Sequence, residues 1–196
     1  ILQTDPIIGQ VTAPHLQVTF RRNTNLKDLL LHSHFQQPYI KTSTLGNLKG
    51  FFPCGACKAC KGSQKVLQYV SPGSVQPLPI TKFMTCNTDH VVYCIRCPCN
   101  MTYVGSTTKK AKCRILEHMR AITNKDFSYP VSRHFADMHN SNRYMLQFFC
   151  LDTVVKSIRG GDRVKKLRRL ESRYIIALDS KFPTGLNMAE ELISHL

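Results

Sequence analysis

The sequence contains no tryptophan, few acidic residues and no long apolar run. Its 12 Asp and Glu stand against 27 Lys and Arg, which gives a formal net charge of +15. A charge of this sign favours a polyanionic partner, with nucleic acid ahead of an anionic membrane surface. No stretch reaches the roughly 18 uninterrupted apolar residues of a membrane span, and the first residues carry no secretion-signal pattern. We therefore expect a protein that binds nucleic acid and does not insert into a membrane.

The residues that are present indicate a folded chain with reduced thiols. A hydrophobic content of 42% over 196 residues is ordinary for one domain or two small ones. Because the chain begins with Ile1, we expect it to be part of a longer polypeptide. Its nine cysteines are an odd number and follow no secretion signal. This combination favours zinc binding over a disulfide framework.

Composition divides the chain into three expected parts. Residues 1–50 are expected to form a linker or docking arm, with a strand at 15–22 and a helix at 23–35. Residues 51–86 are dense in Cys, Gly and Lys and are expected to form a zinc-binding segment, with a loop over 71–79. Residues 87–196 are expected to form the main domain.

Periodicity predicts six elements in the main domain. Residues 90–96 and 101–107 read as a β-hairpin whose turn places Asn100 in the left-handed conformation. The remaining elements are expected to be helices at 108–122, 129–140 and 162–180 and a strand at 144–155. Pro130 is expected in a first helical turn, Asp162 as an N-cap and Pro183 beyond a helix end. The order predicts an α/β fold with a small three-stranded antiparallel sheet flanked by helices, preceded by the Cys-rich segment and the linker.

A glutamate interrupts the apolar face of the last helix. At 100° per residue, Glu171 falls in the middle of the face formed by Val164, Leu167, Tyr174, Ile175 and Leu178. Burying a carboxylate without compensation costs several kcal/mol. Glu171 must therefore bind a cation, form a buried salt bridge or line a cleft, and the helix geometry does not choose among these.

Four further residues are candidates for the same site. Two of them lie on a predicted helix, and two are tyrosines on predicted strands. Arg114 and His118 are four residues apart and border the apolar stripe of their helix, as an exposed rim also would. Tyr93 and Tyr103 lie in the two hairpin strands, where core packing is the ordinary role of a tyrosine. Gly105 after Tyr103 would leave room for a group such as a phosphate to approach the backbone.

Two sets of residues have the spacing of zinc ligands. Cys97, Cys99, His134 and His139 could complete one tetrahedron and would pin the hairpin turn to the helix at 129–140. Cys54, Cys57 and Cys60 form a double C-x2-C that needs a fourth ligand. We expect Cys86 as that ligand, with His90 or Cys94 as substitutes. Cys113 and Cys150 are expected to be packing residues.

The order of these motifs resembles the GIY-YIG nuclease superfamily. The resemblance is carried by "VVY" with Tyr93, "YVG" with Tyr103, then Arg114, Glu171 and, in "PTGLN", Asn187. The "CPC" run between the tyrosine motifs and the "HFADMH" run are similar to the endonuclease domain of Penelope-like retroelements. Residues 81–190 carry the match, and "FRRNTNLKDLLLHS" with "CGACKAC" resembles what precedes the nuclease in those elements. Val91 departs from the pattern, because it stands where the first motif has glycine.

The resemblance implies cleavage of a DNA phosphodiester that depends on Mg²⁺ or Mn²⁺. Glu171 would hold the catalytic ion and Arg114 would stabilise charge on the phosphate, with Asn187 as the family's late asparagine. Tyr93, Tyr103 or His118 would accept the proton, and the sequence does not choose among them. Nucleic-acid contacts are expected from Lys109, Lys110, Lys165, Lys166, Arg168 and Arg169.

Three functions are compatible with these patterns. The first is an endonuclease that nicks target DNA to provide a 3′ end for target-primed reverse transcription. Element RNA and the reverse transcriptase domain of the same polypeptide are then expected partners, and the location is nuclear. The second is a non-catalytic zinc module that binds nucleic acid, and the third is a RING-like protein-interaction domain. Glu171 on an apolar face favours the first.

Overall fold

The computed structural model describes residues 48–71, 76–156 and 161–188, all within one compact unit. The strand and helix expected at 15–22 and 23–35 lie outside the described residues. No helix in the described ranges has the length and apolar character needed to cross a membrane.

A three-stranded antiparallel sheet forms the centre, as predicted. Its strands are β5 (Val91–Arg96), β6 (Thr102–Thr107) and β7 (Gln147–Thr153), in the order β6-β5-β7. The central strand is rich in β-branched and aromatic residues and is almost entirely buried. Asn100 adopts the left-handed conformation expected for the turn, with φ of 68°. The register places Tyr93 directly opposite Gly105.

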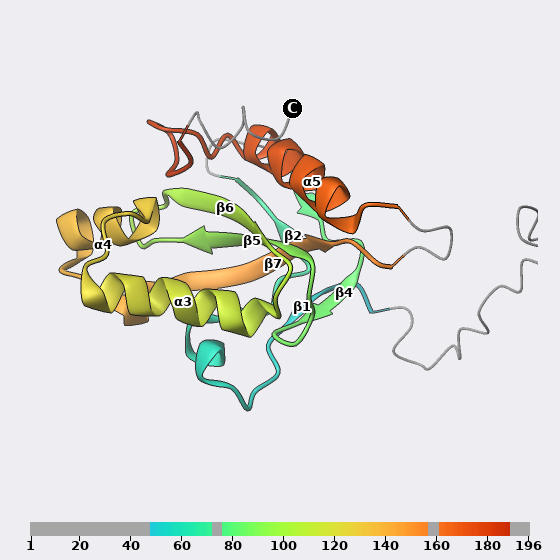
Figure 1. The fold of residues 1–196 in the computed structure, drawn as a ribbon, viewed down its shortest axis with the longest axis horizontal. Helices are drawn as coiled ribbons and strands as arrows, with labels where there is room; N and C mark the ends of the chain where they lie inside the picture. The colour runs from blue at the N-terminus through green and yellow to red at the C-terminus, as the bar shows by residue number, and fades with distance from the viewer. Residues whose placement is uncertain (1–47, 72–75, 157–160, 189–196) are drawn as a thin grey trace, which may run out of the picture. The chain divides into compact units, whose positions relative to one another are not determined.

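Three α-helices flank this sheet, and Figure 1 shows α5 on the side of β6 away from α3. The helices are α3 (Ala111–Asn124), α4 (Pro130–His139) and α5 (Arg163–Ala177). Pro130 lies in the first turn of α4, and the Asp162 carboxylate accepts hydrogen bonds from the first backbone N–H groups of α5. Both starts agree with the sequence.

Two element starts differ from the sequence prediction because side chains cap the preceding turn. The Thr107 hydroxyl accepts the N–H of Lys109, so α3 begins at Ala111 and not at 108. The Asn142 side chain accepts the N–H of Tyr144 and begins the 3₁₀ helix η4 (Arg143–Met145), which delays β7 to Gln147. Local hydrogen bonds of this kind compete with regular structure.

Short elements precede the sheet. β1 (Gly50–Phe52) pairs in parallel with β4 (Phe83–Thr85), and β2 (Gln68–Tyr69) pairs antiparallel with β3 (Leu78–Pro79). β3 lies inside the stretch expected to be a loop. The 3₁₀ helix η3 (Lys58–Gly62) lies between β1 and β2 in the chain.

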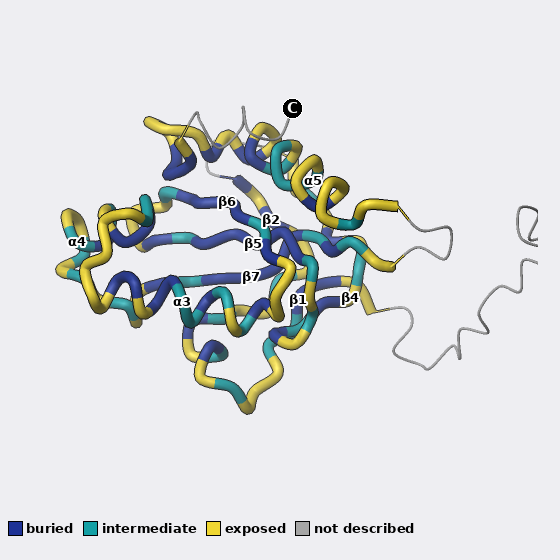
Figure 2. The backbone as a smooth tube through the Cα atoms, viewed as in Figure 1, coloured by how far each residue is buried: buried dark blue, intermediate teal, exposed yellow. Residues whose placement is uncertain are grey.

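The Cys-rich segment and the sheet share one core, which the dark segments of Figure 2 follow. Phe51 is fully buried, and its ring centroid lies 5.3 Å from that of Phe148 in β7. Lys82 joins β4 to β7 through Asp152, at 2.8 Å. Residues before and after position 86 therefore pack in one core. The division of the chain into a segment 51–86 and a domain 87–196 stays a prediction.

Candidate functional site

A buried polar cluster surrounds the hydroxyl of Tyr93. Its Oη lies 2.8 Å from Nε2 of His118 and receives a hydrogen bond from Nε of Arg114 at 3.1 Å. Tyr93 is only 2% exposed, and His118 is 1% exposed. β5 supplies the tyrosine, and one turn of α3 supplies both partners. The structure thus brings three of the expected site residues into direct contact.

His118 is neutral in this cluster. Burial, followed by the charge of Arg114, lowers the pKa of His118 to about 3. Its Nδ1 has no hydrogen-bond partner among the described residues. An orphaned buried N–H is rarer than an orphaned acceptor, so we place the hydrogen on Nε2. In that tautomer Tyr93 Oη accepts N–H groups from both His118 and Arg114.

Gly105 makes room for the two tyrosines and not for a phosphate. A Cβ at Gly105 would lie 2.6 Å from Tyr93 Oη and 2.9 Å from Cε1 of Tyr103. The space above the glycine is therefore filled by phenol rings, which corrects the interpretation drawn from the sequence. Tyr103 is buried, with its ring 5.8 Å from that of His118.

Arg114 also belongs to an ion-pair network that the sequence reasoning missed. Its Nη1 donates to Glu117 Oε2 at 3.1 Å, and Lys109 Nζ donates to Glu117 Oε1 at 2.7 Å. Burial acts to lower the pKa of Arg114, but its interactions with Tyr93 and Glu117 outweigh it, and the pKa is raised. The i,i+3 spacing of Arg114 and Glu117 is the sequence signal for this pair.

A polar cleft of about 280 Å³ lies between the N-terminal part of α3, the end of β6 and α5. Ser106, Lys109, Arg114, Glu117 and Arg168 contribute its polar and charged lining. Its apolar wall includes Leu167 and Val164, and Val164 is 39% exposed although the sequence put it on the core face. Arg114 therefore reaches from the tyrosine cluster to an open, charged cleft.

Glu171 lies beside this cleft on α5. It stands one turn from each of the buried residues Leu167 and Ile175, so the predicted face is correct, and it is half-buried. Its Oε2 accepts a hydrogen bond from Ser106 Oγ at 2.7 Å. Gly105 and Ser106 are neighbours in β6 and their side-chain positions face opposite sides of the sheet. The acid and the tyrosine cluster are thus held on either side of β6, and Ser106 and Arg114 meet in the cleft.

Asn187 holds backbone in place. Its amide donates to Val104 O at 2.7 Å and accepts from Val104 N at 2.9 Å and from Ser180 Oγ at 2.8 Å. Leu186 N also bonds Thr102 O, so the segment before Asn187 lies along the outer edge of β6. This geometry supports an indirect role for Asn187, through the position of β6.

The first candidate metal centre consists of Cys54, Cys57, Cys60 and Cys86, with ligand atoms all within 4.8 Å of one another. Cys60 Sγ lies 3.5 Å from that of Cys54, 3.4 Å from that of Cys57 and 3.6 Å from that of Cys86. The backbone N–H of Ala56 is the main cause that lowers the pKa of Cys54 to about 6, whereas burial raises the pKa of Cys86 to about 12. Four converging sulfurs could hold a metal ion such as zinc.

The second candidate centre consists of Cys97, Cys99, His134 and His139, also within 4.8 Å of one another. The structure joins Cys97 and Cys99 in a disulfide, although the sequence favoured zinc over disulfides. Nε2 of His134 lies 3.2 Å from both sulfurs, and Nε2 of His139 is buried with no partner among the described residues. An orphaned imidazole nitrogen aimed at this cluster fits a metal ligand, so the four side chains could hold an ion when both thiols are reduced.

The expected cationic contacts are all on the surface. Lys109, Lys110, Lys165, Lys166, Arg168 and Arg169 are exposed. Cys150 is fully buried as expected, but Cys113 is exposed and is not a packing residue.

No protein-family model, curated protein or solved structure gives a significant match to this chain. The resemblance stated from the motifs therefore stays a prediction, and the function proposed below rests on that resemblance together with the geometry of the site.

Proposed function

We propose that this chain is a metal-dependent endonuclease domain of the GIY-YIG type that nicks DNA for target-primed reverse transcription. The observation that carries the proposal is the buried Tyr93–His118–Arg114 cluster, whose arginine opens onto a cleft beside Glu171. A binding module has no need of a tyrosine hydroxyl held by an arginine and a neutral histidine below the surface. The reverse transcriptase would lie elsewhere in a longer polypeptide, with element RNA as a further partner and nuclear DNA as the target.

The residues around Glu171 fit a hard divalent cation. Mg²⁺ is commonly bound through one or two carboxylates, with water and substrate phosphate as the other ligands. Glu171 offers a half-buried carboxylate next to the cleft, with Ser106 to orient it. When bound there, Mg²⁺ or Mn²⁺ would polarise the phosphate and stabilise the departing 3′ oxygen.

Arg114, His118 and Tyr93 would have separate roles in the cleavage step. The Arg114 guanidinium lines the cleft and would stabilise the negative charge that develops on the phosphate. His118 is neutral and hydrogen-bonded to Tyr93, which favours a positioning role for the histidine. In its phenolate form, with an N–H of the Arg114 cation directed at its oxygen, Tyr93 would then be the better proton acceptor from the attacking water. The water oxygen bonds to phosphorus as the bond to O3′ breaks. The water proton passes to the Tyr93 phenolate and the departing O3′ takes a proton from solvent, which leaves a 3′-hydroxyl and a 5′-phosphate.

The test is nicking of supercoiled plasmid with Mg²⁺ by the purified chain. We expect Glu171→Gln to slow nicking by about 100-fold or more while DNA binding is retained, since the carboxylate holds the ion. Asp137→Asn, an exposed acid on α4, is the matched control and should nick like the parent. Equal nicking by the parent and Glu171→Gln would refute the assignment of the acid.

The second candidate is a zinc-dependent nucleic-acid-binding module without catalysis. The two clusters that could hold metal and the exposed Lys and Arg favour it. A parent chain that binds plasmid and does not nick it with Mg²⁺ or Mn²⁺ would establish this alternative over the first.

A further inference from the structure

A second groove lies on the face of α3 that points away from the cleft. It has a volume of about 440 Å³ and is lined by Lys58, Lys61, Leu116, Met119, Arg120, Arg143 and Tyr144. At 100° per residue, Leu116 and Arg120 stand on the opposite side of α3 from Arg114 and His118. The groove is therefore separate from the site proposed for cleavage.

Four cations converge on this groove from three elements. Lys58 and Lys61 belong to η3, Arg120 to α3 and Arg143 to η4. Within the part of the chain that the structure describes, none of the four forms an ion pair with a carboxylate. In contrast to the cleft, where Glu117 pairs with both Lys109 and Arg114, the groove has no acidic side chain among the described residues that line it.

An exposed aromatic ring stands at the edge of these charges. Tyr144 is 67% exposed, so most of its ring is open to solvent. The Arg143 guanidinium lies 5.0 Å from the centroid of the Tyr144 ring and donates to its hydroxyl at 3.1 Å. The tyrosine is thereby held in one orientation beside an apolar floor made by Leu116 and Met119.

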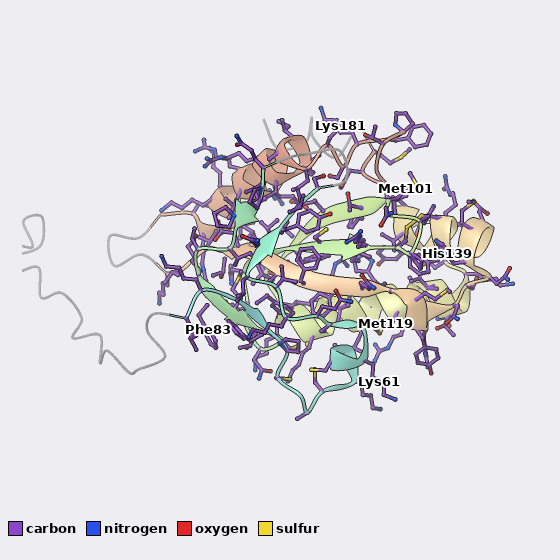
Figure 3. All side chains as sticks on the ribbon, turned by 180° about the vertical axis from the view of Figure 1, so that it is seen from behind. Lys61, Phe83, Met101, Met119, His139 and Lys181 are labelled. Atoms are coloured by element: carbon purple, nitrogen blue, oxygen red, sulfur yellow. A yellow bond between two sulfur atoms is a disulfide. The ribbon has the colours of Figure 1, made fainter. Side chains whose placement is uncertain are left out.

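The Cys54/Cys57/Cys60/Cys86 cluster positions one wall of the groove. A Cβ at Gly62 would lie 2.5 Å from Leu146 O and 3.2 Å from Met119 Cε, so η3 rests directly on α3 and on the residue that follows η4. Cys57 is the N-cap of η3 and Cys60 lies within it. Figure 3 shows Lys61 and Met119 on these adjoining elements. The same turn that presents two sulfurs thus presents Lys58 and Lys61.

We propose that this groove binds single-stranded nucleic acid, with a base stacked on Tyr144 and phosphates along the four cations. A positively charged groove with an exposed aromatic ring is the arrangement by which proteins hold unpaired strands. Bases inside a duplex are already stacked and offer no free face to Tyr144, so the groove should prefer single strands. Both RNA and single-stranded DNA have this chemistry.

The test measures fluorescence anisotropy of labelled single strands of about 12 nucleotides, a length within the usual range of such sites. The full 196-residue chain is titrated against oligo-U, oligo-dT and a duplex of equal length, without added Mg²⁺. We expect Tyr144→Ala to weaken single-strand binding about 10-fold and Tyr144→Phe to preserve it. Phe127→Ala is the control, because Phe127 is an exposed aromatic outside the groove.

The salt dependence of the affinity separates the contribution of the cations from that of base stacking on Tyr144. We expect Lys58→Ala with Lys61→Ala to reduce the slope of log affinity against log salt by about 0.7 for each phosphate that the variant no longer neutralises. Lys125→Ala, an exposed lysine outside the groove, should leave the slope unchanged.

The outcomes decide the proposal without reference to cleavage. Weaker single-strand binding by Tyr144→Ala and by the lysine pair, with both controls like the parent, supports it, and the oligo-U and oligo-dT arms then show whether RNA or DNA is preferred. Equal effects of Tyr144→Ala and Phe127→Ala on single-strand binding, or a loss of duplex binding by Tyr144→Ala as large as its loss of single-strand binding, would overturn it. Because no nicking is measured, a chain that fails to cleave plasmid can still pass this test.

Discussion

The hydroxyl of Tyr93 is held by two nitrogen donors in a buried space that one glycine keeps open. Arg114 and His118 come from the same helical turn, and Gly105 lies directly opposite on β6. These residues depend on one another. Gly105 leaves space for the Tyr93 ring, and the Tyr93 hydroxyl lies within hydrogen-bond distance of neutral His118 and of Arg114. Stability and site geometry are therefore coupled at this point.

His118 predicts an acid-sensitive stability. Its folded-state pKa of about 3 lies below the ordinary 6.5, so the unfolded chain binds the proton first as pH falls. The contribution of neutral His118 is present above pH 6.5 and is lost progressively as the pH falls toward 3. Urea unfolding at several pH values should show a shallower pH dependence for His118→Gln. Identical pH slopes would contradict the buried neutral state.

Gly105→Ala is predicted to destabilise the fold by about 1–3 kcal/mol, as overpacking does. The added Cβ would clash with both tyrosine rings, which are buried. Denaturant unfolding measures the loss, and plasmid nicking should fall with it. The control Ser128→Ala changes an exposed loop residue and should cost little. A Gly105→Ala chain of parental stability would mean that the rings can move aside.

The sequence predicted the features of single residues that depend on one helix or strand. It did not predict contacts between residues of two different elements. Helix spacing alone places Glu171 between Leu167 and Ile175. Ser106 as its hydrogen-bond donor could not be foreseen, because that contact joins α5 to β6 across 65 positions. The role of Gly105 was misread for the same reason, since only the sheet register shows which ring lies above it.

At the scale of elements, the outer edge of β6 is covered by the chain that follows α5. Asn187 pairs with both backbone groups of Val104, and Leu186 N bonds Thr102 O. An open strand edge would otherwise be available for pairing with another chain. The position of the strand that separates Glu171 from the tyrosine cluster depends on this segment.

Asn187→Ala is predicted to lower the free energy of unfolding by about 2–4 kcal/mol, because it leaves two buried backbone groups without partners. Urea unfolding checks the value. Asn124→Ala, at an exposed position at the end of α3, is the control and should change stability little. If Asn187→Ala keeps parental stability but loses nicking, a direct catalytic role would replace the one inferred from its hydrogen bonds.

Cys86→Ser is predicted to remove one equivalent of bound metal per chain. Cys86 comes from the turn after β4 and closes the cluster begun by Cys54, Cys57 and Cys60. Metal content measured by mass spectrometry should fall by one ion, and the melting temperature should drop because metal binding contributes to folding. Cys113→Ser, an exposed cysteine outside both clusters, should keep parental metal content. A loss of metal by both variants would show that the effect is not specific to the cluster.

Element starts followed the sequence except where side chains cap a turn, whereas α5 ends at Ala177, three residues before the predicted end at 180. Strand and helix types came from periodicity, which is a local property, and the three-stranded sheet followed from their order. The starts of α3 and β7 shifted by three residues each because Thr107 and Asn142 bind neighbouring N–H groups. The pairing of β1 with β4 was not predictable, since these strands are only three residues long.

At the scale of the whole molecule, positive charge dominates. The chain has a net charge of +15. Among the described residues, exposed cations gather on α5, at the start of α3 and around the groove beside η3. Composition alone predicted a polyanionic partner, but it could not show that the cations divide between a cleft with acids and a groove without them. Whether a cation lies in the cleft or in the groove depends on which face of each helix packs against the rest of the protein.

Duplex binding is predicted to fall steeply with salt. If the exposed cations contact six to ten phosphates, affinity should drop by about 10³ to 10⁵ between about 50 and 200 mM salt. Replacing Lys165, Lys166 and Arg169 with Ala should reduce the log–log slope by about 0.9 for each phosphate that these side chains neutralise in the parent. Lys156→Ala, on the stretch before α5, serves as the control. A slope unchanged in the triple variant would exclude the exposed face of α5 from the DNA interface.

The edge-to-face contact of Phe51 with Phe148 decides which fragment of this protein can be expressed on its own. A fragment that starts after Cys86 would lack Phe51, Ala59 and Met84, which belong to the same buried core as β7, and would expose apolar surface to water. Such a fragment should aggregate when it is expressed. A gene fragment for a minimal soluble domain should therefore begin upstream of Gly50.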